Sequence, residues 1–229
     1  MSAPPLGTRA SGPGAPAWRL ARLLRATIGK LALALYRTRI QGEAHVPAHG
    51  GYVLAGNHVS YLDPALLWCA APEPTHFIAK QELFDTPVLG WAFRRLWAFP
   101  ISRGEADREA IQRATALLKA GEPVGIFPEG TRQVGGAEGA LPAMGEAHQG
   151  VSFIAMRADV PIVPVAIAGT ERALPRGAVL PRFPRVTIRY GEPVRVTDFP
   201  QGGRKEKMQA MTAEVMRRIA CERELAEKE

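Results

Sequence analysis

The sequence YVLAGNHVSYLDP spans residues 52–64 and carries the feature that decides the fold. Its first four residues are apolar and predict a buried strand. Pro64 and the Ala/Leu-rich residues after it predict the opening of a helix. His58 and Asp63 therefore share one strand-to-helix turn, with four residues between them.

His58 and Asp63 have a catalytic and a structural interpretation. An imidazole near a hydroxyl can take its proton at working pH, and a carboxylate on the other ring nitrogen fixes the tautomer. The structural alternative stays open, because an aspartate directly before a proline is typical of a helix N-cap, and a turn histidine can simply be hydrogen-bonded. Ser60 is a weaker candidate nucleophile, since no G-x-S-x-G turn surrounds it.

Length, charge and cysteine content narrow the class of protein. A chain of 229 residues with 46% apolar residues fits one sizeable α/β domain. Its formal net charge of +7 favours an anionic partner such as nucleic acid, anionic lipid or a phosphorylated small molecule. Cys69 and Cys221 lie far apart without a Cys/His cluster, so we expect no disulfide scaffold, no metal site and a reducing cytosolic setting.

The N-terminal part divides into a tail and a helix. Residues 1–16 are rich in Pro, Gly, Ala and Ser, which predicts a disordered tail. Residues 17–38 predict a basic amphipathic helix that is too short in its apolar run to span a bilayer. It can lie among lipid headgroups, or its stripe can pack on the protein's own core. The expected apolar stripe is Leu20, Leu24, Ile28, Leu31 and Leu35, with Arg19, Arg22, Arg25 and Lys30 on the other side.

Strands and helices alternate through residues 39–229, which predicts an α/β domain with a mixed, largely parallel central sheet flanked by helices. The proline residues in the strand expected over 161–168 favour an edge or irregular position for it. The other expected strands cover 52–55, 76–80, 98–101, 123–127 and 185–190, and the expected helices cover 64–70, 83–97, 105–120 and 205–227.

A second candidate site is the sequence FPEGTR at residues 127–132, which follows another predicted strand. A glycine lets a ligand approach the backbone, and Arg132 can bind a phosphate through two hydrogen bonds. The alternative is a surface turn with a local Glu129–Arg132 pair. Arg103, just after the strand ending at Ile101, is a third cationic candidate, although a single arginine is ordinarily a surface residue.

Together these blocks resemble a known family. The stretch at 57–63 is similar to the NHxxxxD motif of the bacterial PlsC-like 1-acylglycerol-3-phosphate acyltransferases, the glycerolipid acyltransferases. Three further blocks follow in the family's order, FPISRG at 99–104, FPEGTR at 127–132 and VPIVPV at 160–165, which contains Pro164. The segment AKQELF at 79–84 also looks like the family's, and the resemblance covers about residues 40–195.

The resemblance implies transfer of an acyl group from a thioester, acyl-CoA or acyl carrier protein, to the sn-2 hydroxyl of lysophosphatidic acid, without a cofactor or metal. It implies that His58 is the general base and Asp63 its partner. The implied ligands of the acceptor's glycerol-phosphate are Arg103, Glu129, Gly130, Thr131 and Arg132. One departure concerns the acceptor: many members carry a lysine in an F-K-x-G block, where residues 146–150 here are EAHQG.

An enzyme for lipid substrates needs access to a bilayer, so the resemblance favours the interfacial role of residues 17–38, on the cytoplasmic face of the cell membrane as a peripheral protein. One alternative is another lysolipid or an ornithine-type lipid as acceptor. The other is a non-catalytic basic lipid-binding or nucleic-acid-binding module, although nucleic acid is disfavoured because the aromatic residues do not alternate with the basic ones.

Overall fold

The computed structural model describes residues 22–80, 85, 99–101, 105–130, 133, 144–145, 147–173 and 182–228. Within these ranges seven strands form one sheet in the order β1-β7-β6-β2-β5-β3-β4. The strands are β1 Arg39–Gln41, β2 Val53–Gly56, β3 His76–Lys80, β4 Phe99–Ile101, β5 Val124–Ile126, β6 Ile162–Ala168 and β7 Thr187–Tyr190. The helices are η2 Arg25–Gly29, α2 Lys30–Leu35, η3 Glu43–His45, α3 Asp63–Ala70, α6 Glu105–Lys119, α7 Gly150–Ala158, η4 Thr170–Arg172, η5 Val196–Asp198 and α8 Arg204–Glu227.

β2 lies at the centre of the sheet, parallel to β6 on one side and to β5 on the other. β3 and β4 extend the parallel part, whereas β7 pairs with β6 in antiparallel fashion and β1 lies parallel to β7. Every residue of β2 and β6 is buried. The prediction of a mixed, largely parallel sheet is therefore confirmed.

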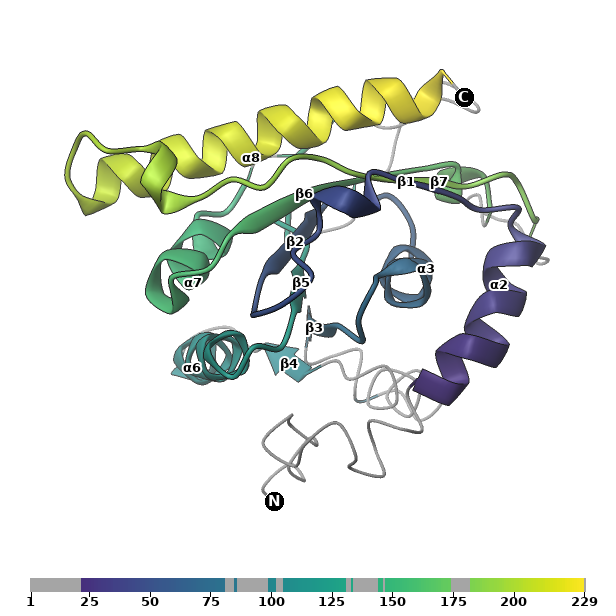
Figure 1. Cartoon of the computed structure of the whole chain (residues 1–229), viewed down its shortest axis with the longest axis horizontal. Coiled ribbons are helices and arrows are strands. Elements are labelled where there is room, and N and C mark those ends of the chain that lie inside the picture. The colour runs from purple at the N-terminus through teal and green to yellow at the C-terminus, as the bar shows by residue number, and fades with distance from the viewer. Residues whose placement is uncertain are drawn as a thin grey trace.

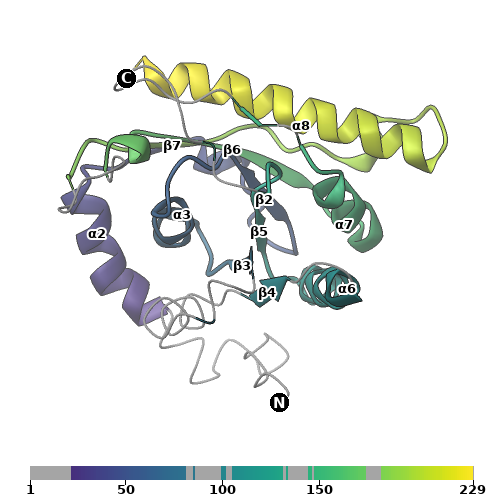
Figure 2. The same cartoon turned by 180° about the vertical axis from the view of Figure 1, so that it is seen from behind.

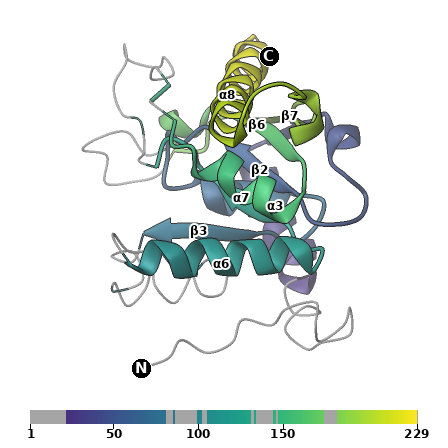
Figure 3. The ribbon, with the colours of Figure 1, turned by 90° about the vertical axis from the view of Figure 1, so that its left-hand side faces the viewer.

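Helices cover both faces of this sheet (Figures 1 and 2). Leu54 of β2 points into the cluster that contains α3 and Tyr36, whereas Val53 and Ala55 point into the cluster made with α6, α7 and α8. Figure 3 shows α6 running along the β3 side of the sheet and α8 crossing above it. Met211, Val215 and Ile219 of α8 are fully buried, and their four-residue spacing places them on one face of the helix.

The position expected for the proline-containing strand is wrong, because β6 lies between β2 and β7 inside the sheet. The N–H of Ile162 donates to the carbonyl of Val194. Because N–H directions alternate along a strand, the nitrogen of Pro164 faces the same side as that of Ile162. The β7 ladder begins at Val165, and the carbonyl of Pro164 still accepts the N–H of Gly191 at 2.8 Å, so the proline lacks only its donor at the end of this ladder.

The N-terminal helix has two apolar sides instead of the single stripe expected. Leu24 and Leu33 pack against the core with α3, whereas Leu23, Ile28, Leu31 and Leu35 are exposed by 49 to 69%. The reason is the π-helical segment η2, whose wider turn shifts the phase of the side chains before and after it. Arg25 accordingly lies over the ring of Trp68, 5.8 Å from its centroid, and is not on a wholly solvated face.

Within the described ranges, no helix combines the length and the hydropathy needed to cross a bilayer. The predicted disordered tail at 1–16 and the helix predicted over 83–97 fall outside the described residues, apart from Asp85.

Candidate active site

The turn between β2 and α3 brings His58 and Asp63 into contact. Nδ1 of His58 lies 2.9 Å from Oδ2 of Asp63, and the same oxygen accepts the backbone N–H groups of Val59 and Ser60 at 2.7 Å each. Asp63 is the first residue of α3, and its side chain caps no helical N–H. The N-cap interpretation is therefore wrong, because the carboxylate points back into the turn and towards the imidazole.

This contact assigns the tautomer of His58. A carboxylate accepts hydrogen bonds, so Nδ1 carries the proton and donates it, and Nε2 is left with a lone pair. The imidazole side chain keeps 16% of its surface exposed, whereas that of Asp63 has none. A partly exposed imidazole backed by a buried carboxylate is the arrangement of a general base.

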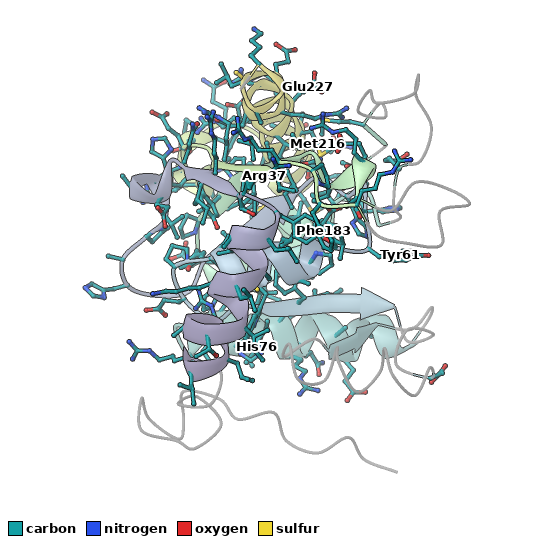
Figure 4. All side chains as sticks on the ribbon, turned by 90° about the vertical axis from the view of Figure 1, so that its right-hand side faces the viewer. Arg37, Tyr61, His76, Phe183, Met216 and Glu227 are labelled. Carbon is teal, nitrogen blue, oxygen red and sulfur yellow. The ribbon has the colours of Figure 1, made fainter. Side chains whose placement is uncertain are left out.

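A second histidine–carboxylate pair serves as a comparison. Nε2 of His76 lies 2.6 Å from Oε2 of Glu122, but both side chains are completely buried. His76 is the first residue of β3, at the opposite end of the parallel strands from the turn that carries Tyr61 (Figure 4). Burial separates the two pairs, because only His58 can reach a substrate.

The block at 127–130 lies against the same turn. Phe127 packs its ring on the imidazole of His58, and the carbonyl of His58 accepts the N–H of Gln133 at 2.8 Å. Glu129 is 4% exposed, and its carboxylate accepts the N–H of His58 at 3.3 Å and the N–H of Gly145 at 2.9 Å. The NHxxxxD and FPEGTR blocks therefore form one site. Glu129 connects the turn at His58 to the segment at Gly145 through hydrogen bonds.

Gly130 and His148 meet at the edge of this site. Gly130 has a φ of 64°, and a Cβ there would lie 2.8 Å from Cδ2 of His148. The N–H of His148 also donates to the carbonyl of Pro128 at 2.9 Å. The EAHQG departure thus falls beside the FPEGTR block in space.

Sequence reasoning did not assign roles to two further residues, Asn57 and Thr170. The amide of Asn57 donates to the carbonyl of Ile167 at 2.9 Å and accepts its N–H at 2.7 Å. The hydroxyl of Thr170 donates to Oδ1 of Asp63 at 2.6 Å. Asn57 joins the end of β2 to β6, and Thr170 joins η4 to α3, each across more than 100 residues. The available signal was that both residues follow the carboxyl ends of predicted strands.

Glu171 is a third carboxyl group near this turn. Its Oε2 accepts the N–H of Gly169 at 2.8 Å, and Arg172 lies 3.2 Å from its Oε1. Burial raises the pKa of Glu171, and the nearby Asp63 charge adds to that effect. Three of the predicted substrate ligands, Arg103, Thr131 and Arg132, lie outside the described residues.

The site sits inside a region that matches known proteins. A family model described as "Acyltransferase" matches residues 37–168, which include β2, the His58–Asp63 turn and Gly130. A 1-acyl-sn-glycerol-3-phosphate acyltransferase of Bacillus subtilis is 31% identical over 182 residues, covering 79% of this chain and 85% of that protein. The chain belongs to the acyltransferase family.

Two other relatives extend the match. The acyltransferase is 33% identical over 146 residues to the chloroplastic 1-acyl-sn-glycerol-3-phosphate acyltransferase BAT2 of Brassica napus, of which it spans 40%. The crystal structure of the 1-acyl-sn-glycerophosphate (LPA) acyltransferase PlsC from Thermotoga maritima has the same fold, with a TM-score of 0.64 and 23% identity. That similarity covers 88% of this acyltransferase and 81% of the Thermotoga chain.

Proposed function

We infer that this acyltransferase moves a fatty acyl group to the sn-2 hydroxyl of 1-acyl-sn-glycerol-3-phosphate, giving phosphatidic acid. The activity for which its relatives from Bacillus and Brassica are named supports this acceptor. The observation that carries the mechanism is the partly exposed imidazole of His58, held by the buried Asp63 through Nδ1. The acyl donor is a thioester, acyl-CoA or acyl carrier protein, and the reaction uses no metal or other cofactor.

His58 acts as the general base of the transfer. The acceptor hydroxyl gives its proton to Nε2 while its oxygen attacks the thioester carbonyl carbon. The imidazolium that forms is stabilised by Asp63, which is already hydrogen-bonded to Nδ1. Collapse of the tetrahedral intermediate breaks the carbon–sulfur bond, and the proton passes from Nε2 to the departing thiolate. The products are the new ester and the free thiol, and the imidazole is neutral again.

The acceptor's phosphate is bound at the edge of the site formed by the second and third sequence blocks. Arg103 and Arg132 supply positive charge for it, and the backbone at Gly130 and Thr131 approaches it closely. Glu129 acts differently, because its carboxylate already accepts backbone N–H groups of His58 and Gly145. Glu129 therefore fixes the position of the phosphate-binding loop relative to His58.

Residues 17–38 dock the enzyme on the anionic, cytoplasmic face of the cell membrane as a peripheral helix. Support comes from the exposed side of the helix, where Leu23, Ile28, Leu31 and Leu35 face solvent beside the exposed Arg22 and Lys30. Exposed leucines next to basic side chains fit burial among acyl chains with pairing to headgroup phosphates. Phe183, 44% exposed and 5.4 Å from the ring of Tyr36, continues this apolar face.

Activity is tested by crossing donors with acceptors. Wild-type enzyme is incubated with acyl-CoA or acyl carrier protein and with lysophosphatidic acid, another lysolipid or an ornithine-type lipid. We expect turnover with lysophosphatidic acid. In His58→Ala the rate should fall at least about a thousandfold, because the group that activates the acceptor hydroxyl is removed. Preference for another acceptor contradicts the proposed substrate. Equal activity in His58→Ala contradicts the mechanism, and binding without turnover supports a non-catalytic lipid-binding module.

Membrane docking is tested with vesicles containing phosphatidylglycerol. The double variant Ile28→Asn/Leu31→Asn should bind about tenfold or more weakly, because each buried leucine-sized side chain contributes about 1.5–3 kcal/mol. Leu225→Asn is the matched control, since Leu225 is an exposed leucine of α8. Equal binding of the double variant and wild type would mean that this helix face does not meet the bilayer.

A further inference from the structure

Asp63 is held from two directions. Its Oδ2 accepts three hydrogen bonds from its own turn, which come from His58, Val59 and Ser60. Its Oδ1 accepts a hydrogen bond from the hydroxyl of Thr170, at 2.6 Å. Within the described part of the chain, Thr170 is the donor to Oδ1. Asp63 and Thr170 are both fully buried, so water does not substitute for either partner.

The fold places Thr170 at this point by a sharp turn after β6. Gly169 has a φ of 99°, and a Cβ there would lie 2.1 Å from the carbonyl oxygen of Arg185. A glycine is therefore required, and the chain turns directly into η4, whose first residue is Thr170. The hydroxyl consequently comes from η4, directly after β6, whereas the imidazole comes from the β2–α3 turn and the carboxylate from the first residue of α3.

We propose that Thr170 is a positioning residue for the acyl transfer, which fixes the Asp63 carboxylate so that its other oxygen orients His58. The proposal rests on the function inferred above. Thr170 does not touch the imidazole, and it acts through Asp63. The hydrogen bond from Thr170 holds the carboxylate in one orientation, and in that orientation Oδ2 accepts the proton on Nδ1 of His58.

The surrounding charges make this donor matter. Glu171, on the same short helix, places a second carboxyl group near Asp63, and Glu129 lies on the other side of the turn, at the N–H of His58. The cation nearest to Glu171 is Arg172, which is half exposed and pairs with that residue. Among the described residues, the donors to the Asp63 carboxylate are neutral groups. Thr170 is the donor that does not belong to the β2–α3 turn.

Loss of the hydroxyl leaves Oδ1 buried without a donor. The carboxylate then rotates, and Nδ1–H of His58 loses its fixed acceptor. The fraction of enzyme with Nε2 ready to accept a proton falls. We expect the effect in the chemical step, because the side-chain hydrogen bond of Thr170 that the structure describes is to Asp63.

Three variants separate positioning from packing. Thr170→Val keeps the shape without the donor, Thr170→Ser keeps the donor, and His58→Ala is the reference for an absent base. With lysophosphatidic acid and acyl-CoA we expect kcat of Thr170→Val to fall about ten- to a hundredfold, with both KM values within about twofold of wild type. The pH–rate profile of Thr170→Val should differ from that of wild type, and Thr170→Ser should stay within about threefold of wild-type kcat.

A spectroscopic readout makes the test independent of turnover. The full-length protein is labelled with ¹⁵N-histidine, and the His58 signals are assigned by their absence in His58→Ala. We expect a protonated Nδ1 in wild type and Thr170→Ser, and a mixed tautomer signal in Thr170→Val. Melting temperatures of all variants are measured in parallel, and the kinetic comparison is made on folded protein below the lowest of them.

The outcomes are distinguishable. Wild-type kcat, pH profile and tautomer in Thr170→Val overturn the positioning role. Equal losses in Thr170→Ser and Thr170→Val also overturn it, because the hydroxyl is then not the cause. An inactive wild type, or an active His58→Ala, would contradict the proposed function itself, whatever Thr170→Val does.

Discussion

The imidazole of His58 lies against the phenyl ring of Phe127, with ring centroids 4.4 Å apart and an angle of 27° between the ring planes. Phe127, directly after β5, thus supports the imidazole of His58 in the β2–α3 turn. Phe127 is itself stacked on Phe77, at 6.0 Å, and Gly56 leaves room for it, since a Cβ at that position would lie 3.3 Å from Cε1 of Phe127. The orientation of the base depends on an aromatic layer as well as on a carboxylate.

Replacement of Phe127 by leucine tests this layer. A stacked aromatic pair contributes about 0.5–1.5 kcal/mol, so Phe127→Leu should lower kcat by up to about tenfold with little change in either KM. The swap is nearly volume-conserving, and the free energy of unfolding should fall by less than about 1.5 kcal/mol. Steady-state kinetics in detergent-dispersed substrate check it, with Phe153→Leu on α7 as control. An unchanged kcat in Phe127→Leu would remove the stack from the mechanism.

Asn57 is expected to matter for stability before it matters for chemistry. Asn57→Ala leaves the N–H and the carbonyl of Ile167 unpaired in a fully buried strand, at about 1–3 kcal/mol for each group. Thermal unfolding should shift down by about 5–15 °C. Ser152→Ala is a matched buried deletion with a smaller expected shift, because the hydroxyl of Thr212 keeps its bond to the carbonyl of Met208. Equal melting of both variants would contradict the bridging role of Asn57.

Gly130 should tolerate no side chain. Its positive φ strains any other residue by about 1–2 kcal/mol, and the added Cβ would collide with the ring of His148. We expect Gly130→Ala to lower kcat/KM for the acceptor about tenfold, and Gly130→Ala/His148→Ala to recover part of the loss. Gly150→Ala is the control, since a Cβ there meets nothing within 4 Å. No recovery in the double variant would assign the whole effect to backbone strain.

The C-terminal helix makes a prediction about pH. Hydrogen bonds from Arg217, aided by Arg218, lower the pKa of Glu214 to about 2. Because the folded-state pKa is lowered, the stabilisation is present above the ordinary value of about 4.5 and is lost as pH falls towards 2. The Glu214 side chain is 23% exposed and its partner Arg217 is 66% exposed, so solvent screens the pair and Glu214→Gln should cost only about 0.3–1 kcal/mol at pH 7.

Thermal melts of wild type and Glu214→Gln between pH 7 and pH 2 check this expectation. The difference in melting temperature should be about 1–4 °C at pH 7 and should close between pH 4.5 and pH 2. Glu224→Gln, at an exposed position of the same helix, gives the background. A difference that persists at pH 2 would show that packing, and not charge, is responsible.

Local patterns in the sequence were sufficient for much of the fold. The apolar run before Gly56 and the proline after Asp63 predicted a strand, a turn and a helix, and those elements form as expected. The helical face of Met211, Val215 and Ile219 was also predictable, because its period is that of a regular α-helix. Single-helix periodicity failed only where the π-helical segment η2 changes the period.

The site was predictable in part, because only some of its contacts are local. His58 and Asp63 are five residues apart, so one turn determines their contact. The hydrogen bond of Thr170 to Asp63 spans 107 residues, and its existence depends on β6 lying next to β2. No spacing rule along the chain predicts such a neighbour, and the prolines of β6 favoured an edge position that the sheet does not adopt.

The pairing of β2 with β6 has a consequence for how the enzyme matures. During synthesis the NHxxxxD stretch emerges early, whereas Ile167 and Thr170 emerge more than 100 residues later. Until β6 joins the sheet, Asn57 and Asp63 each lack their distant partners, and contacts between such remote residues form slowly in folding. Nascent chains therefore carry the base without its full support. Acyl transfer becomes a property of the completed sheet, and the onset of activity during refolding will report the docking of β6.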